Sequence, residues 1–499
     1  MGIVIRQSIK SVFVTLIGVL LGALITVLSM EYFPKTELGF QQNLIKITIM
    51  VSYLGLYGFN TTLLIFGQRY PPGHPSRGTF LSLTLIAPLI LTLLVCASYY
   101  FLKNYVGLIY SKETDVVMME QYFFLFPMLT FLVAAISWLE GYLQSLHKTA
   151  LQNFAREVLA RIIYITLIVL YATGVLSFGQ FLWLYVITYL IPFCFLLMIA
   201  LRNPGFRFEI RKDALFLSEV KEIFRFSGYH MLTVVSTVLI LQLDAVLLAP
   251  LDRDGFDALA VYSIAVLAVS MLRNPTRVIG IAVTPAFTKS YNEGDMLNLA
   301  DMFRRSAINM QIIACAMIAL VYLNINNIQE MIAFIKHGYD EVKWLIMILM
   351  LGQFSDMVTG LNYELIGVTR FYRFNFWIAI IFVTIVLVLN LLLIQRMGIY
   401  GAAWATTIGL VIFNISKTVF LWYKMKLQPF SRKTWTVMLS VLLIAGVCWI
   451  IPYTLNVIVD TAIRSIVFCV LLWIVLYKTA VSPEINGLTS NIIRKRKLF

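Results

Sequence analysis

The sequence predicts an all-α, polytopic membrane protein, and three observations support that class. Of its 499 residues, 60% are hydrophobic and only 13% are charged, against about 25% charged residues in a typical soluble domain. Apolar stretches of roughly 20 residues, long enough for a helix to cross a bilayer, recur from end to end. These stretches are continuous, whereas transmembrane β-strands alternate apolar and polar residues. We therefore expect about fourteen transmembrane helices, counted by the length that a bilayer requires.

The predicted helices follow one another with short polar turns between them. The first set precedes a longer polar stretch and covers 8–30, 44–66, 79–102, 122–143, 158–176 and 181–201. The second set follows that stretch and covers 227–248, 258–283, 306–325, 344–366, 376–394, 401–422, 435–455 and 461–477. Glycine-containing turns such as "FPKTELGF" and "LDRDGFDA" separate neighbouring segments.

The polar stretch "RNPGFRFEIRKDALFLSEVKEIFRFSG" divides the chain into two parts. We expect a six-helix bundle over 1–201, a basic linker over 202–226, a second six-helix bundle over 227–422, and two extra helices with a basic tail over 423–499. A faint internal echo between the two bundles is typical of transporters, whose substrate sites lie between repeated halves.

The net charge of +14 reflects membrane topology rather than nucleic-acid binding. With the N-terminus in the cytoplasm, one side of the membrane receives about three times as many Lys and Arg residues as the other, as the positive-inside rule requires. An even number of helices then places both termini in the cytoplasm. We expect no nucleic acid among the partners.

The sequence carries no signature of a membrane enzyme. Walker, GxGxxG, HExxH, GxSxG and Cys-x-x-Cys motifs are absent, and the outer loops are too short for a catalytic domain. An ATP-driven pump and a membrane hydrolase are therefore disfavoured, and we expect neither a catalytic residue nor a metal site.

Two stretches resemble a known family. "RFYRFNFWIAIIFVTIVLVLNLLLIQRMGIYGAAWATTIGLVIF" and "LQLDAVLLAP…LAVYSIAV" are similar to the oligosaccharide flippases of bacterial polysaccharide biosynthesis, members of the multidrug/oligosaccharidyl-lipid/polysaccharide exporter superfamily. The order of the predicted helices fits this resemblance over nearly the whole chain.

The resemblance implies an alternating-access transporter, with two pseudo-symmetric bundles around a central cationic cavity. Its cargo would be an undecaprenyl-pyrophosphate-linked oligosaccharide, flipped to the outer leaflet of the bacterial inner membrane for O-antigen or capsule-type assembly. Membrane lipids and polysaccharide polymerase or assembly proteins would be the other partners. No cofactor is implied, although coupling to H⁺ or Na⁺ stays open.

Two arginines interrupt the apolar segment 258–283. Arg273 and Arg277 are four residues apart and share one face of a continuous helix. Arginine inside a membrane is costly and normally faces a bundle interior or a water-filled cavity. Two guanidinium groups on one face can grip a pyrophosphate through bidentate bonds, and Pro275 between them supplies a hinge. The alternative is that both arginines extend to the interface as anchors.

Other charged residues are candidates for the same cavity. Lys46, Lys10, Arg6 and Lys417 are the further cations that we expect to contact cargo, with anchoring at the membrane interface as the alternative for each. Asp244 and Asp356 are candidates for H⁺ or Na⁺ coupling or for ion pairs with these cations. We also expect a structural salt bridge between Glu140 and Arg161.

Two other functions stay open at this point. A cation-coupled multidrug exporter of the same superfamily would need an acidic cavity, which the excess of basic candidates disfavours. A flippase for the peptidoglycan precursor is not excluded. The sequence leaves undetermined the sugars of the cargo, the coupling ion, the oligomeric state and the resting conformation.

Overall fold

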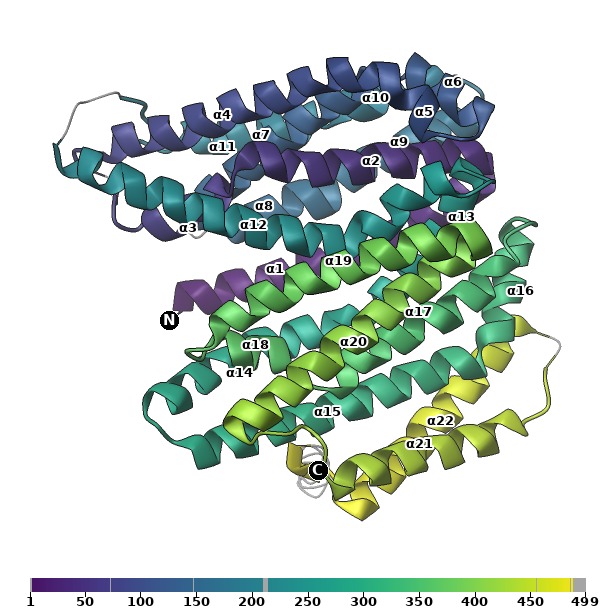
Figure 1. Cartoon of the computed structure of the whole chain (residues 1–499). Coiled ribbons are helices and arrows are strands. Elements are labelled where there is room, and N and C mark those ends of the chain that lie inside the picture. The colour runs from purple at the N-terminus through teal and green to yellow at the C-terminus, as the bar shows by residue number, and fades with distance from the viewer. Residues whose placement is uncertain are drawn as a thin grey trace. The chain divides into compact units, whose positions relative to one another are not determined.

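A computed structural model describes residues 2–71, 73–146, 148–209, 214–454, 456–484 and 486–487. All regular secondary structure in these residues is helical, and most helices are long (Figure 1). The helices of the N-terminal part are α1 (Gly2–Tyr32), α2 (Lys35–Leu56), α3 (Phe59–Phe66), α4 (Arg77–Leu102), η1 (Lys103–Tyr105), α5 (Val106–Ile109), α6 (Glu113–Gln121), α7 (Leu125–Ser145), α8 (Thr149–Phe154), η2 (Ala155–Leu159), α9 (Ala160–Ala172), α10 (Phe178–Thr188) and α11 (Leu190–Leu201).

The helices of the rest of the chain follow the polar stretch predicted from the sequence. They are α12 (Ala214–Leu251), α13 (Phe256–Ser270), α14 (Arg273–Asn292), α15 (Met296–Leu323), α16 (Ile325–Ile335), α17 (Glu341–Val358), α18 (Asn362–Gly367), α19 (Tyr372–Met397), α20 (Ile399–Met425), α21 (Arg432–Trp449) and α22 (Val457–Thr479). Every apolar segment predicted from the sequence coincides with one of these helices or with a broken pair of them.

The lengths and composition of these helices confirm an all-α polytopic membrane protein. Among the described residues, nine helices are long and apolar enough to cross a membrane, or ten if the bent pair α2 and α3 forms one span. Shorter apolar helices add to them. Large apolar side chains such as Leu442 and Leu443, 67% and 71% exposed, would be costly in water but suit a lipid-facing surface.

The chain forms two compact units, residues 1–260 and 261–499. In the first unit α7 packs against α2, α3, α4 and α11, and α12 packs along α2. Gly39 on α2 allows a close approach, because a Cβ there would collide with the backbone of Phe256. Tyr57 and Gly58 have positive φ angles of 49° and 77°, and the chain turns by 52° there between α2 and α3. The division into bundles and linker predicted from the sequence stays a prediction.

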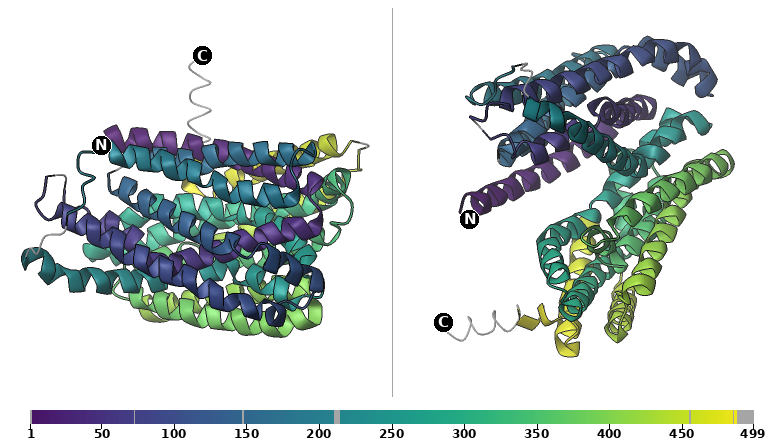
Figure 2. Two further views of the ribbon diagram at one scale, coloured as in Figure 1. Left: turned by 90° about the horizontal axis from the view of Figure 1, so that it is seen from above. Right: turned by 60° about the vertical axis from the view of Figure 1, so that its left-hand side comes forward.

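In the second unit α20 packs between α17 and α19, and α15 contacts α14, α17 and α21. The last two long helices, α21 and α22, pack on each other and on α15 (Figures 1 and 2). Their shared core is apolar and includes Val437, Cys448 and Phe468, each fully buried.

The prediction of one unbroken helix over 258–283 is wrong, although Arg273 and Arg277 do lie in the same helix. α13 ends at Ser270, Met271 and Leu272 form a turn, and α14 begins at Arg273. Pro275 is the reason that the sequence offers: it has no N–H to donate to the carbonyl of Met271, so a helix through this point would lose a hydrogen bond. As the third residue of α14, Pro275 occupies a position where that N–H has no partner within the helix in any case.

Candidate functional site

A cavity of about 590 Å³ with charged residues in its lining lies within the second unit. Its lining comes mainly from α14, with the end of α17 and the short helix α18 completing it. The lining residues are Arg273, Thr276, Gly280, Thr284, Pro285, Asp356 and Glu364. Both a cation and two carboxylates therefore face one cavity among helices that are otherwise largely apolar. Such intramembrane charges mark substrate or ion pathways.

In the described part of the chain, the guanidinium group of Arg273 is held by Gln353 alone, and most of its N–H donors remain available. Its Nε donates a hydrogen bond of 2.8 Å to Oε1 of Gln353 on α17. The two terminal Nη groups have no hydrogen-bond or ion-pair partner among the described residues. Gln353 is 2% exposed, so packing fixes the acceptor. A guanidinium held through Nε presents both Nη groups as a fork that matches two oxygens of a phosphate.

Lys417 on α20 and Asp356 on α17 form a buried ion pair. The Lys417 Nζ lies 3.7 Å from the Asp356 carboxylate, and Lys417 is only 3% exposed. Glu364 also attracts the Lys417 ammonium group. The Lys417 ammonium lies 4.2 Å from the centre of the Phe413 ring, a cation–π contact that helps to compensate for its lost hydration.

The structure therefore brings three of the predicted site residues into one cluster. Arg273 and Asp356 line the cavity directly, whereas Lys417 lies behind Asp356. Sequence reasoning missed Glu364, whose carboxylate lies so close to Gly280 that a Cβ there would come within 3.1 Å of its Oε1. The sequence feature that could have identified Glu364 is its position as a carboxylate inside the apolar segment 344–366. Gln353 was a polar residue of the same segment, but its role toward Arg273 could not be inferred.

A second charged pair lies in the first unit. Lys46 on α2 and Asp244 on α12 are 8% and 6% exposed, and the Asp244 carboxylate attracts the Lys46 ammonium group. One Asp244 oxygen also accepts a hydrogen bond of 2.8 Å from the N–H of Ala245. The ion-pair alternative for Asp244 thus has a physical basis. Cargo contact by Lys46 and ion coupling by Asp244 stay predictions.

The remaining candidates have different outcomes. The side chains of Arg6, Lys10 and Arg277 lie outside the described residues. Pro275 lies two residues into α14 from its start, next to the break described above, and its hinge role stays a prediction. The described residues contain no group of three His, Cys, Asp or Glu residues that could hold a metal ion.

The predicted Glu140–Arg161 salt bridge is wrong. Glu140 lies 3.7 Å from Arg156, and Arg161 instead pairs with Glu157 at 2.7 Å. The residues 155–159 form a turn of π-helix. Arg161 is held by Glu157 and by the carbonyl oxygen of Gly18 on α1, and Arg156 is the arginine that lies beside Glu140.

A comparison with protein families matches residues 4–291 to the family described as polysaccharide biosynthesis protein. No curated protein matches the chain. Among solved structures, the lipid II flippase MurJ in an inward closed conformation is 14% identical, with a TM-score of 0.74 over 96% of this chain and 100% of that one.

Two further solved structures come from transporters of the MOP superfamily. An inward-facing multidrug resistance MATE family transporter is 14% identical, with a TM-score of 0.64 over 82% of this chain and 94% of that one. A transporter from Pyrococcus furiosus, described as having a binding pocket of reverse polarity, is also 14% identical, with a TM-score of 0.55 over 85% of this chain and 95% of that one. At these identities the likeness establishes the fold, which is that of MOP-superfamily transporters.

Proposed function

Because the chain belongs to the polysaccharide biosynthesis protein family, we propose that it flips an undecaprenyl-pyrophosphate-linked oligosaccharide across the bacterial inner membrane. The cargo moves from the cytoplasmic to the outer leaflet and supplies surface polysaccharide of the O-antigen or capsule type. Both termini lie in the cytoplasm in this proposal, in keeping with the distribution of Lys and Arg. A polymerase or other assembly protein would receive the flipped unit.

The observation that carries the proposal is the orientation of Arg273. Its Nε is bonded to Gln353, and its Nη groups have no partner in the described part of the chain. A pyrophosphate offers adjacent oxygens to such a fork, and charge-assisted bonds of this kind are roughly twice as strong as neutral ones. The hydroxyl of Thr276, which also lines the cavity and has no hydrogen-bond partner in the described residues, is a further donor. Lys417 contributes by balancing Asp356 and Glu364 instead of touching the cargo.

Asp356 and Glu364 give the same cavity a route to ion coupling. With both carboxylates ionised, their charge is balanced by Lys417 and Arg273. A pyrophosphate bound to Arg273 would add negative charge beside them and so favour uptake of a proton or a cation. Release of the cargo would reverse that preference. We propose that this exchange links cargo movement to H⁺ or Na⁺.

The same two carboxylates favour a second candidate function. A cation-coupled multidrug exporter would use Asp356 and Glu364 to bind a cationic drug, and Arg273 would then be an anchor. A peptidoglycan-precursor flippase would use Arg273 as proposed, but with a different lipid-linked cargo. The oligosaccharide flippase, the multidrug exporter and the peptidoglycan-precursor flippase are distinguished by identifying which molecule the protein transports.

The test is a deletion strain complemented with the wild type, with Arg273→Ala, or with Arg396→Ala. Arg396 is an exposed arginine at the end of α19 and serves as the matched control. Surface polysaccharide, cytoplasm-facing lipid-linked precursor, peptidoglycan precursor and tolerance to cationic drugs are measured in each strain, together with the protein level.

The proposed function predicts loss of surface polysaccharide in the deletion strain, with lipid-linked oligosaccharide retained on the cytoplasmic side. Wild type and Arg396→Ala restore it, and Arg273→Ala does not. Unchanged polysaccharide with altered drug tolerance would reject the flippase in favour of the exporter. Accumulated peptidoglycan precursor would reject the oligosaccharide in favour of that cargo.

A further inference from the structure

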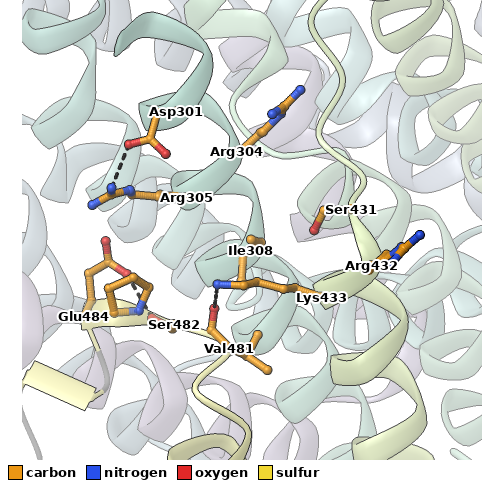
Figure 3. Close-up of a pocket in the computed structure, with 11 residues that line it drawn as sticks. Asp301, Arg304, Arg305, Ile308, Ser431, Arg432, Lys433, Val481, Ser482 and Glu484 are labelled. Atoms are coloured by element: carbon orange, nitrogen blue, oxygen red, sulfur yellow. Dashed lines mark hydrogen bonds and ion pairs between the residues drawn. The ribbon is translucent and has the colours of Figure 1, made fainter. Parts of the chain in front are cut away.

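A second cavity, of about 370 Å³, lies within the second unit, and Figure 3 shows the residues that line it. Three segments that are far apart in the sequence form it: the first half of α15, the beginning of α21, and residues 481–484 after α22. Its walls carry four basic side chains, Arg304, Arg305, Arg432 and Lys433, and two acidic ones, Asp301 and Glu484. The cavity therefore has a net charge of +2.

The basic side chains of this cavity differ in how they are held. Arg305 forms an ion pair of 2.8 Å with Asp301. Lys433 donates a hydrogen bond of 3.1 Å to the carbonyl oxygen of Val481, which fixes its position without neutralising its charge. Arg304 and Arg432 have no ion-pair or side-chain hydrogen-bond partner in the part of the chain that the structure describes.

This arrangement suits an anion with several oxygens. Ser431, Arg432 and Lys433 place the beginning of α21 at the cavity, and the N-terminal end of a helix of this length favours negative charge. Arg304 and Arg432 can each offer a pair of N–H donors to phosphate oxygens. A phosphate group is the common biological anion with this geometry, and it is supplied either by a lipid headgroup or by a soluble phosphate.

The surroundings favour the lipid. From Trp435, one turn after Arg432, α21 presents a row of exposed apolar side chains that includes Leu439 and Leu442, with exposures of 65%, 58% and 67% for the three residues in that order. A helix that is apolar and exposed along its length faces lipid chains, and tryptophan is enriched where such a helix meets the headgroups. Basic cavities between helices at this level bind anionic headgroups. A lipid with its phosphate in the cavity would have its acyl chains along α21.

We propose that this cavity is a binding site for an anionic membrane phospholipid, separate from the cavity around Arg273. The phosphodiester accepts bonds from Arg304 and Arg432, Lys433 completes the positive field, and the acyl chains pack on the exposed face of α21. The site depends on neither the cargo nor the transport cycle.

The test uses the full-length protein, purified in detergent and stripped of lipid. Phosphatidylglycerol, phosphatidylcholine and inorganic phosphate are titrated separately, and bound lipid is counted by native mass spectrometry. The variant pair is Arg304→Gln with Arg432→Gln. The matched control is Arg202→Gln with Arg225→Gln, which removes the same charge from two exposed arginines elsewhere. Thermal unfolding without lipid checks that both double variants are folded.

The proposal predicts that phosphatidylglycerol binds at least about tenfold more tightly than phosphatidylcholine, the size of effect expected from one lost charge-assisted bond pair. The Arg304/Arg432 variant loses this preference, and the Arg202/Arg225 variant keeps it within about twofold. Equal binding of phosphatidylglycerol by the wild type and the Arg304/Arg432 variant overturns the proposal. Displacement of the lipid by equimolar inorganic phosphate also overturns it, because the site would then be one for a soluble anion.

Discussion

Arg273 and Gln353 show how one hydrogen bond can set the position of a charged side chain. A free arginine inside a membrane protein would extend toward the nearest water. The bond from Nε to the buried amide of Gln353 keeps the guanidinium at the cavity wall. In the proposed flippase, Gln353 is therefore a positioning residue, and Arg273 is the group that contacts cargo.

Replacing Gln353 by leucine should weaken cargo binding without unfolding the protein. The substitution removes the oxygen that accepts the hydrogen bond from Arg273. It also removes the buried Nε2 of Gln353, which has no hydrogen-bond partner in the described residues and whose burial therefore costs free energy. We expect the cargo concentration for half-maximal flipping to rise about fivefold, equivalent to roughly 1 kcal/mol. The thermal unfolding midpoint should be unchanged or higher. A lower midpoint with unchanged cargo dependence would make Gln353 purely structural.

Lys417 and Asp356 should behave as a coupled pair in unfolding experiments. Removing one partner of a fully buried pair costs about 3–5 kcal/mol, but the Asp356 side chain is 30% exposed, so we expect about 2 kcal/mol for Lys417→Met. Lys417→Met combined with Asp356→Asn should recover much of that loss. Additive losses in the double variant, measured by chemical denaturation in detergent, would show that the two side chains do not stabilise each other.

At the scale of helices, two turns position charged residues of the chain. The turn at Met271 and Leu272 separates α13 from α14, so Arg273 stands at the start of a separate helix. At another turn, between α12 and α13, the N–H of Phe256 donates a hydrogen bond of 2.8 Å to Asp115 in α6. Lys112 and Asp257 form an ion pair of 2.7 Å beside it. The hydrogen bond and the ion pair together hold this turn against the beginning of α6.

Replacing Pro275 by alanine should reduce flipping without reducing stability. Alanine restores the N–H that could bond to the Met271 carbonyl and removes the obstacle to a continuous helix. We expect slower flipping with an unfolding midpoint equal to or above that of the wild type. The flipping rate and the midpoint are measured on the same preparation. Wild-type flipping by Pro275→Ala would contradict the hinge role.

The buried carboxyl of Asp115 should make the stability of the folded protein depend on pH. Burial raises the pKa of its carboxyl above the ordinary value of 3.8, although the Phe256 N–H and Lys112 oppose that change. A carboxyl whose pKa is raised by folding binds its proton more tightly in the folded state, so its contribution to stability is present below pH 3.8 and is lost as the pH rises through the raised pKa.

The measurement is the unfolding midpoint of the wild type and of Asp115→Asn across this pH range. The amide cannot ionise, so the wild type should lose stability relative to Asp115→Asn as the pH rises above about 4. A wild type that instead gains stability over Asp115→Asn with rising pH would mean that Lys112 and the Phe256 N–H outweigh the cost of burial.

At the scale of the whole molecule, the sequence predicts helices well and contacts between them poorly. The apolar segments coincide with helices because a run of about 20 apolar residues has few alternatives in a bilayer. The break before Arg273 was not predicted, because the turn residues Met271 and Leu272 are apolar and carry no turn signal. The partnership of Lys417 with Asp356 was equally hidden, since it depends on how α17 packs on α20. The partner of Glu140 was hidden for the same reason, since Arg161 is held by Glu157 and by the carbonyl oxygen of Gly18 on α1.

The central claim is that this chain flips a pyrophosphate-linked oligosaccharide and holds it through Arg273. Its most direct test is reconstitution into liposomes with a fluorescent polyprenyl-pyrophosphate-linked oligosaccharide, following the fraction of label that a membrane-impermeant reagent reaches with time. We predict flipping by the wild type and by Arg396→Ala, and flipping at least about tenfold slower with Arg273→Ala, from the loss of a charge-assisted bond pair. Equal rates for Arg273→Ala and the wild type, or no flipping by a folded wild type, would contradict the claim.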